Sequence, residues 1–273
     1  MESTNIRYIN TIEEMSLNAW PSHKMELYDG WLLRFSHNYT HRTNSVHQVG
    51  ESHIPLDEKI AYCEEVYHHL HSPTIFKISP LIDSSFDHLL KERGYKKEHI
   101  TENMVMDYHD FKPLRPTHVE KEYYGRNSGL PSIVGYENGN VIHLKDRVTD
   151  DWVKGVLMLN GTTNPTLQRI VPSMYQAILK EVIVASVWDD GEMIGSGLGI
   201  LDRDHVGIYA IYVNQEYRRK GIARAIVSTI LTEAEKKGCK HAYLQCVKGN
   251  TPAKNLYESI GFKYLYEYWF RVK

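Results

Sequence analysis

Residues 208–234 read IYAIYVNQEYRRKGIARAIVSTILTEA, and this stretch decides the fold class. The apolar, β-favouring residues 208–213 predict a buried strand, and apolar residues at helical spacing in 222–234 predict a helix. A short cationic turn joins the two. A helix that lies between two successive buried strands is typical of a parallel crossover, so we expect a sheet whose central strands run parallel.

The turn between strand and helix carries three consecutive cations and a glycine, Arg218, Arg219, Lys220 and Gly221. The first N–H groups of a helix have no intrahelical partner and lie at the positive end of the helix dipole. A phosphate or pyrophosphate would be bound well there. Glycine lets the backbone approach such a ligand closely, and the small Ala223 adds little bulk.

Two common phosphate loops are absent, because the sequence contains neither GxxxxGK[ST] nor GxGxxG. The pattern that remains is R-x-x-G-x-A at Arg218, Gly221 and Ala223. It resembles the pyrophosphate-binding motif of the GCN5-related N-acetyltransferases (GNAT), which bind coenzyme A at this turn. An ordinary basic helix start would also fit so short a motif, and the assignment therefore needs a second one.

Residues 250–262, NTPAKNLYESIGF, supply the second motif. Their pattern N-x-x-A-x-x-L-Y-x-x-x-G-F is very similar to the C-terminal motif of the same family, and it follows the first motif by one predicted strand and one predicted helix. A capped amphipathic helix with Leu256 and Ile260 in the core would give a similar pattern. Two motifs in the family's order are far more specific than one, so residues 140–273 are identified as a member of the family.

The resemblance implies where acetyl-CoA, the acyl donor, would bind. It would lie where the strand that ends near Val213 and the strand at 244–247 splay apart. Main-chain groups of Ile211 and Val213 would pair with the pantetheine, a main-chain N–H near Val213 would polarise the thioester, and residues 219–224 would surround the pyrophosphate. The residues expected to contact acetyl-CoA are Ile211, Tyr212, Val213, Arg218, Arg219, Lys220, Gly221, Ile222, Ala223, Arg224, Asn250, Ala253 and Tyr257.

The resemblance also implies catalytic roles. Tyr257 matches the tyrosine that in many relatives protonates the departing thiolate, and a phenol with a pKa near ~10 can serve a thiolate with a pKa near ~8.5. Relatives often place a carboxylate on the strand before the cationic turn, but residues 206–212 contain none. Asp204 and His205, at the start of that strand, could remove the amine proton through water, or could be an ordinary polar turn. Tyr209 or Tyr212 would line the acceptor cleft.

The first half of the chain imitates the same layout without its chemistry. Residues 45–49 and 74–79 predict strands that flank a helix at 55–70, and FDHLLKERGY stands in the position of KNLYESIGF. Residues 47–58, from this strand into the start of the helix, carry the acids Glu51, Asp57 and Glu58 and no Arg or Lys, so a pyrophosphate would be repelled. This half is similar to a degenerate GNAT copy without a coenzyme A site. An unrelated α/β domain is the alternative.

We therefore expect an α/β (α+β) protein of two tandem GNAT-like domains, each a mixed, mostly antiparallel sheet with a central parallel crossover and flanking helices. Residues 113–139 are rich in glycine and proline and lack a sustained helical period, which indicates a boundary. The expected divisions are a degenerate domain at 1–125, a junction at 126–139 and a catalytic domain at 140–273.

Composition limits the partners. The 273 residues include 42% hydrophobic and 24% charged residues, typical of an ordinary globular protein, and the net charge of −2 argues against a nucleic-acid binder. No apolar run reaches the ~20 residues of a membrane span, and the N-terminus does not resemble a signal peptide. Three widely spaced cysteines indicate reduced thiols and a cytoplasmic location. His68, His69 and His71 lack metal-ligand spacing, so no metal is expected.

The function expected from the sequence is the transfer of an acetyl group from acetyl-CoA to a primary amine, on a small-molecule acceptor, by a monomer or homodimer. Direct transfer is expected, because neither motif contains a cysteine nucleophile. Two alternatives remain open. The missing carboxylate fits an acyl-CoA sensor without catalysis, and paired GNAT folds also occur in aminoacyl-tRNA-dependent transferases.

Overall fold

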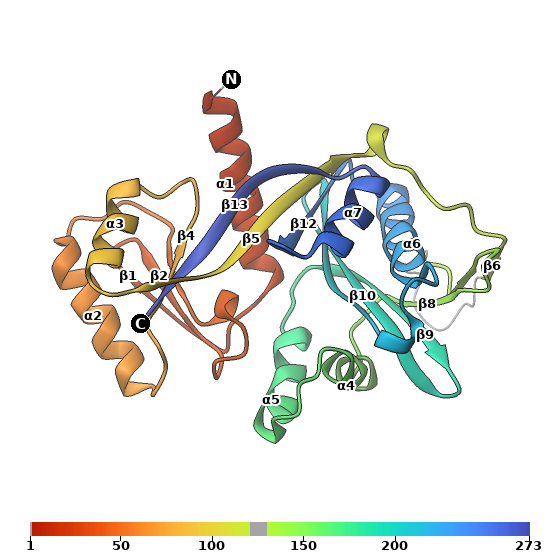
Figure 1. Cartoon of the computed structure of the whole chain (residues 1–273), viewed down its shortest axis with the longest axis horizontal. Helices are drawn as coiled ribbons and strands as arrows, with labels where there is room; N and C mark the ends of the chain where they lie inside the picture. Colours follow the sequence, from red (N-terminus) through yellow and green to blue (C-terminus); the bar gives the residue numbers. More distant parts are fainter. Residues whose placement is uncertain (1, 121–129) are drawn as a thin grey trace. The chain divides into compact units, whose positions relative to one another are not determined.

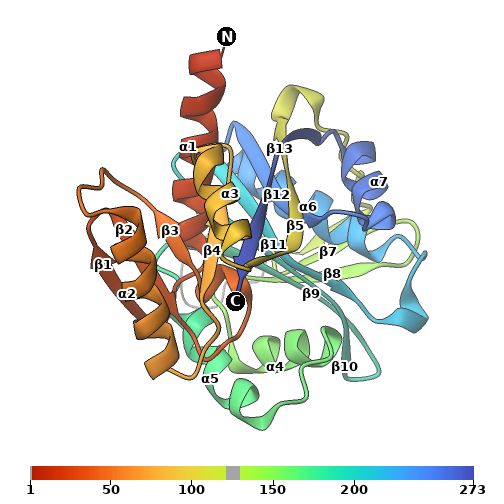
Figure 2. The same cartoon turned by 60° about the vertical axis from the view of Figure 1, so that its left-hand side comes forward.

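The computed structural model describes residues 2–120 and 130–273 (Figure 1). The described chain divides into two compact units. The first consists of residues 2–102, Val247–Gly249 and Tyr266–Lys273, and the second of Asn103–Cys246 and Asn250–Leu265. Figure 2 gives a second view of the helices and strands of each unit.

The first unit begins with α1 (Glu2–Ala19) and contains the strand order β1-β2-β3-β4-β13-β5. Its other elements are β1 (Lys24–Tyr28), β2 (Trp31–Phe35), η1 (His41–Thr43), β3 (Val46–Gln48), α2 (Leu56–His69), β4 (Ile75–Ile78), α3 (Ser84–Glu92) and the first part of β5 (Lys96–Asp107). β3 and β4 are parallel, paired at Val46 and Phe76, and α2 is the crossover between them. Trp31 packs edge-on against Phe76 in the core, with ring centroids 5.6 Å apart. The expected parallel crossover is confirmed.

The second unit contains the strand order β5-β12-β11-β10-β9-β8-β7-β6. Its elements are η2 (Tyr108–Asp110), β6 (His118–Glu120), β7 (Ile133–Gly135), β8 (Val141–Lys145), α4 (Asp150–Leu159), α5 (Pro165–Gln176), β9 (Glu181–Asp189), β10 (Glu192–Asp202), β11 (His205–Val213), η3 (Gln215–Tyr217), α6 (Ile222–Lys236), β12 (His241–Val247) and α7 (Thr251–Ile260). β11 and β12 are parallel and α6 connects them, while the pairs from β6 to β11 are antiparallel. The mixed, mostly antiparallel sheet expected from the sequence is confirmed.

The chain divides at a different place from the one that its composition indicates. The boundary falls at residues 102–103, within β5, and not at 126–139. Residues 121–129 lie outside the described part of the chain, and β7 and β8, which follow, pair within the sheet of the second unit.

The C-terminal strand β13 (Lys263–Val272) belongs largely to the first unit, not to a domain that spans 140–273. Trp269 pairs with Ile78 and Val272 with Ile75, both antiparallel. Backbone hydrogen bonds between Thr74 and Lys273 close this ladder at its end. The first unit is therefore completed by the last residues of the chain, which no local sequence pattern indicates.

Glycines on β10 allow α6 to pack closely on the sheet. A Cβ atom added to Gly195 would lie 2.8 Å from Ile222 Cγ2, and one added to Gly197 would lie 3.0 Å from Ile230 Cδ1. Side chains at these two positions would crowd α6. The two glycines therefore allow α6 to lie close to the sheet. The start of α6 is thereby placed beside the end of β11.

Within residues 2–120 and 130–273, none of the helices has both the length and the apolar character that crossing a bilayer would need.

Candidate functional site

A groove opens where β11 and β12 stop pairing. The two strands are in parallel register from His205↔His241 to Ile208↔Leu244, and no pair is formed beyond Ile208. The groove has a volume of about 650 Å³. It is lined by Leu159, Ile211, Tyr212, Val213, Tyr217, Arg218, Arg219, Gly221, Ile222, Ala223, Arg224, Asn250, Pro252, Ala253, Leu256 and Tyr257. The structure thus brings the two sequence motifs together in one wall.

A β-bulge in β11 faces this groove. Tyr209 pairs with Leu198 and Tyr212 with Ser196, so Ala210 and Ile211 together oppose one residue of β10. Ala210 has a φ of 50°, which a non-glycine residue adopts only when neighbouring structure holds it there. A bulge leaves main-chain groups of the extra residue outside the ladder. The candidate donors to a carbonyl therefore include residues 210–211. The N–H near Val213 that the sequence suggests also stays a candidate. The next residue, Asn214, donates its N–H to the carbonyl of Ile194 on β10, and because N–H groups alternate in direction along a strand, that of Val213 points away from β10.

The N-terminus of α6 lines the groove and has no side-chain cap. Its N-cap is Gly221 in the left-handed conformation, with a φ of 78°. The helices α3, α4, α5 and α7 instead begin with Asp83, Thr149, Asn164 and Asn250, whose side chains accept N–H groups. The first intrahelical bond of α6 runs from the N–H of Ala225 to the carbonyl of Gly221. The N–H groups of residues 222–224 are thus available to an anion.

The cationic side chains of the turn are held in different ways. Arg224 Nη1 donates to Ser259 Oγ at 2.6 Å, and Arg218 Nε donates to the carbonyl of Val213 at 3.3 Å. Lys220 Nζ lies 4.6 Å from the centroid of the Tyr217 ring, and Arg219 is exposed. Together with the helix dipole these charges make the turn strongly attractive to a pyrophosphate.

Asn140, the residue before β8, holds the same turn through its side chain. Its Nδ2 donates to the carbonyl of Lys220 at 3.0 Å. Asn138 lies beside the turn, so a Cβ atom added to Gly221 would be 2.8 Å from Asn138 Nδ2. The left-handed φ of 78° favours glycine at 221, whereas the close Asn138 amide lies at the end of a flexible side chain and could move aside.

Tyr257 lies on α7, in the wall of the groove. Asn250 caps this helix by accepting the N–H of Ala253 at 3.3 Å. The side chain of Tyr257 is 9% exposed and packs against Phe262, with ring centroids 6.0 Å apart. Burial raises the pKa of the Tyr257 phenol above its ordinary value of 10.0, and Cys246 adds to the effect. The hydroxyl therefore carries its proton at neutral pH.

Asp204 and His205 are not brought to the groove. They lie at the start of β11, six residues before Ile211, which corresponds to about 20 Å of extended chain. His205 is buried, its Nδ1 lies 2.7 Å from Asp204 Oδ1, and burial lowers the pKa of its imidazole. The expectation that this pair acts at the reacting amine is corrected, because ligands bind at the carboxyl ends of parallel strands.

The two candidate acceptor-cleft tyrosines also differ in position. Tyr212 is exposed and lines the groove. Tyr209 lies outside the lining, and its hydroxyl donates to the Tyr243 hydroxyl at 2.8 Å.

The described groove lining contains no Asp, Glu or His. It does contain Leu159, Tyr217, Pro252 and Leu256, which the sequence did not assign to the site. Pro252 and Leu256 lie inside the second motif. Their spacing along α7, which puts the two residues on the same side of the helix, could have identified them as groove residues from the sequence. Leu159 ends α4 and has no motif to mark it.

The first unit lacks a counterpart of the cationic turn. Its equivalent loop, which precedes α2, is bound by the Asp29 carboxylate, which accepts the N–H groups of His53 and Ile54, both at 2.9 Å. These backbone bonds and Lys59 hold the pKa of Asp29 well below its usual range. The acid that fills the loop is therefore Asp29, from the turn between β1 and β2, and not Glu51.

Side chains occupy part of the space between the ends of β3 and β4. A cavity of about 80 Å³ lies there, lined in part by Glu13, His47 and Lys77. Glu13 on α1 forms a buried ion pair with Lys77 and accepts a hydrogen bond from the Tyr266 hydroxyl. A larger cavity of about 630 Å³ adjoins it and shares Gln48, Val49 and Ile82 with its lining. The feature that distinguishes the first unit is therefore the loop before α2, which is bound by the Asp29 carboxylate where the second unit has its cationic turn.

Two known families match the two halves of the chain. Residues 162–262 match the acetyltransferase (GNAT) family, and residues 5–123 match the family described as probable histone acetyltransferase Rv0428c C-terminal. The first match covers α5 to the end of the second motif, and so includes the groove. The chain belongs to the GNAT superfamily.

Similar proteins give the same result. An uncharacterized N-acetyltransferase, YobR, from Bacillus subtilis (strain 168) is 23% identical over 97% of this chain and 98% of its own length. A GCN5-related N-acetyltransferase from Kribbella flavida superposes with a TM-score of 0.63 at 10% identity, over 97% of this chain and 94% of that one. A tandem GNAT protein from the clavulanic acid biosynthesis pathway superposes with a TM-score of 0.59 at 12% identity, over 84% and 74%. The tandem GNAT fold is thereby confirmed.

Proposed function

We propose that the second unit transfers an acetyl group from acetyl-CoA to a primary amine of a small-molecule acceptor. The observation that carries this proposal is that one groove is lined by both the uncapped, cationic N-terminus of α6 and a protonated Tyr257. The GNAT match over residues 162–262 supports acetyltransferase chemistry. Acetyl-CoA as the donor and an amine as the acceptor are the parts that the proposal adds.

The pyrophosphate of acetyl-CoA would accept the N–H groups of Ile222, Ala223 and Arg224 and pair with the cations of the turn. The pantetheine would extend along the bulged end of β11, where main-chain groups are outside the ladder. The thioester carbonyl would then lie near residues 210–213, where N–H groups that point away from the β10 ladder can stabilise negative charge on its oxygen.

Transfer would occur in one attack. The lone pair of the neutral amine nitrogen forms a bond to the thioester carbon, and the carbonyl oxygen takes the negative charge. When the tetrahedral species collapses, the C–S bond breaks and the sulfur leaves with its electron pair. Tyr257 gives a proton to that sulfur, and the nitrogen loses one to solvent, so the products are an amide and free coenzyme A.

Amine deprotonation is assigned to solvent, because none of the described groove residues is a carboxylate or an imidazole. An acceptor whose amine has a lowered pKa would need little help. The same absence favours the second candidate function, a sensor that binds acyl-CoA without transfer.

The test is the release of free coenzyme A thiol from acetyl-CoA in the presence of a panel of small amines. Faster release with at least one amine, together with the matching acetylated product, supports the proposal. Tight binding of acetyl-CoA with no acetylated product from any amine would favour the sensor. No binding of acetyl-CoA would overturn both.

A further inference from the structure

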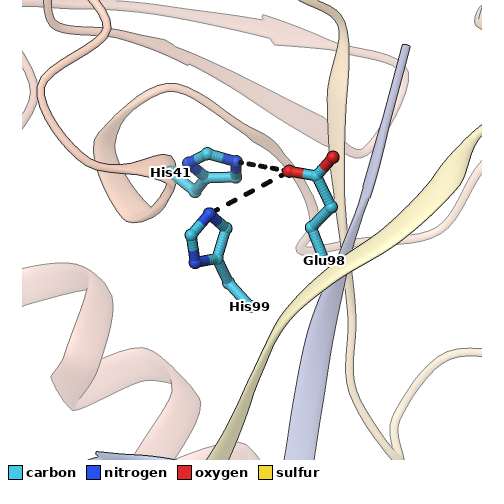
Figure 3. Close-up of side chains that lie close together, drawn as sticks. All are labelled: His41, Glu98 and His99. Carbon is cyan, nitrogen blue, oxygen red and sulfur yellow. Dashed lines mark ion pairs between the residues drawn. The ribbon is translucent and has the colours of Figure 1, made fainter.

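A group of metal-ligating side chains lies in the first unit, apart from the loop and cavity already described. His41 is the first residue of η1, and Glu98 and His99 are consecutive residues of β5. Their ligand atoms all lie within 4.8 Å of one another. Figure 3 shows both imidazole rings turned toward the same carboxylate.

The backbone explains how two consecutive strand residues reach one point. Successive side chains of a regular strand point to opposite faces of the sheet. His99 instead has a φ of 49°, which interrupts the regular strand, and Thr101 Oγ1 holds this conformation by donating to the carbonyl of His99 at 3.0 Å. Glu98 and His99 can therefore both face His41.

The separations fit a metal ion better than direct pairing. Glu98 Oε2 lies 3.7 Å from His41 Nε2 and 4.0 Å from His99 Nε2, both longer than a hydrogen bond. A tetrahedral ion with bonds of about 2.0–2.1 Å holds its ligand atoms about 3.3 Å apart. To reach that geometry, the two oxygen–nitrogen separations would shorten by about 0.4 Å and 0.7 Å, and the ligand atoms, which now lie within 4.8 Å of one another, would come closer by at most about 1.5 Å.

His41 contributes a second, independent observation. Its Nε2 is buried and has no hydrogen-bond partner among the residues that the structure describes. A buried polar atom without a partner costs free energy, and a bound ion would remove that cost.

The ring of His41 is also held in place by its surroundings. It packs against Phe270, with ring centroids 5.3 Å apart, and the neighbouring Arg42 Nε donates to the Tyr268 hydroxyl at 2.8 Å. Glu98 and His99 are 40% and 56% exposed, which leaves an entry path and room for water as a further ligand. The group is thus fixed on one side and open on the other.

We propose that His41, Glu98 and His99 bind a divalent transition metal, Zn²⁺ in particular. Two imidazoles and one carboxylate form a donor set that zinc uses in proteins, with solvent in the fourth position. Mg²⁺ and Ca²⁺ prefer oxygen ligands alone and are excluded by the two nitrogens. The ion would join the connection between β2 and β3 to strand β5.

A second group, Asp107, His109 and Asp110 in the second unit, supplies the control. Its carboxylates already have partners, because Asp110 pairs with Lys263 at 2.7 Å and Asp107 pairs with His241. Its imidazole is 74% exposed. This group should add little to zinc affinity.

The experiment is a titration of the chelator-treated full chain with Zn²⁺, followed by calorimetry, with Co²⁺ as a spectroscopic probe. His41→Phe keeps the ring that packs on Phe270, and His99→Asn keeps a residue that tolerates positive φ. Each should weaken Zn²⁺ binding at least about 10- to 100-fold and remove the nitrogen-ligand bands of Co²⁺. His109→Ala should leave both unchanged.

Thermal unfolding separates loss of the site from loss of the fold. In chelator the two variants should unfold close to the parent chain, and only the parent and His109→Ala should be stabilised by added Zn²⁺. If the parent chain does not bind Zn²⁺, if all variants bind it equally, or if Ca²⁺ or Mg²⁺ binds as tightly, the proposal is wrong.

Discussion

Gly195 on β10 lies directly beneath Ile222, the first residue of α6, so that a Cβ atom at 195 would be 2.8 Å from Ile222 Cγ2. This relationship connects the packing of the sheet to the candidate pyrophosphate site. The N–H groups proposed to bind the anion belong to residues 222–224, and their position depends on how closely α6 approaches β10.

Gly195→Ala should therefore affect both stability and ligand binding. Overpacking of this kind typically costs about 1–3 kcal/mol of unfolding free energy, and a displaced α6 should also bind acetyl-CoA less tightly. Denaturant unfolding and calorimetry would measure the two effects. Gly50→Ala is the control, since its Cβ would meet Gly30 Cα at an ordinary 3.6 Å. Equal behaviour of the two variants would contradict the proposed role of this contact.

Tyr257→Phe should lower turnover about 10²-fold and leave acetyl-CoA affinity nearly unchanged. Phenylalanine fills the same buried space against Phe262 but cannot protonate the sulfur. The expected loss is at the small end of the usual range because a thiolate is already a stable leaving group. Steady-state kinetics with the best amine would decide. Turnover equal to that of the parent chain would remove Tyr257 as the acid.

The two asparagine helix caps allow stability and catalysis to be separated. Asn250 caps α7, which carries Tyr257, and Asn164 caps α5 by accepting the N–H of Thr166 at 2.9 Å. Replacing either by Ala should cost about 1 kcal/mol of unfolding free energy. Only Asn250→Ala should also reduce turnover, because Asn250 lines the groove. A comparable loss of turnover in Asn164→Ala would show that the effect is general destabilisation.

Buried His47 should make stability fall in mild acid. Burial, with Lys77 and Arg34 nearby, lowers the pKa of His47 well below 6.5. In the unfolded chain this imidazole takes up a proton as the pH falls through about 6.5, whereas the folded chain resists it, so stability is full above that pH and declines below it. His47→Gln should flatten the decline between about pH 7 and 5, measured by denaturant unfolding. The exposed His68→Gln should not, and an unaltered slope in His47→Gln would contradict the assignment.

The sequence predicts the parallel crossovers and the cationic turn before α6 because each depends on residues close together in the chain. The helix period from Ile222 and the motif at Asn250–Ala253 are local signals, and both predicted features lie where the structure has them. The assignment of β13 failed for the opposite reason. Trp269 of β13 pairs with Ile78 of β4, which lies far away in the sequence. The residue patterns of the two segments do not show that these strands are neighbours in the sheet.

The direction of β11 explains why Asp204 and His205 were wrongly expected at the site of the reaction. Asp204 directly precedes β11 and His205 is its first residue, but only the opposite end of the strand, from Ile211 to Val213, lines the groove. The grouping of His41 with Glu98 was likewise outside the reach of motif spacing, because η1 and β5 come together only in the folded unit.

The central claim is that the N-terminus of α6 binds the pyrophosphate of acetyl-CoA. The most direct test is the affinity for acetyl-CoA of a variant that carries a substitution in this N-terminus and still folds normally. Ala223 is the second residue of α6 and lines the groove, whereas Thr166 is the second residue of α5 and is exposed outside it. A glutamate suits the positive end of either helix, so both variants should fold as stably as the parent chain.

In Ala223→Glu, however, the carboxylate would occupy and repel the place of the pyrophosphate. Isothermal titration should show that Ala223→Glu loses acetyl-CoA binding at least about 100-fold, equivalent to about 2.7 kcal/mol, while Thr166→Glu binds like the parent. Equal acetyl-CoA affinity in Ala223→Glu, Thr166→Glu and the parent chain would contradict the account.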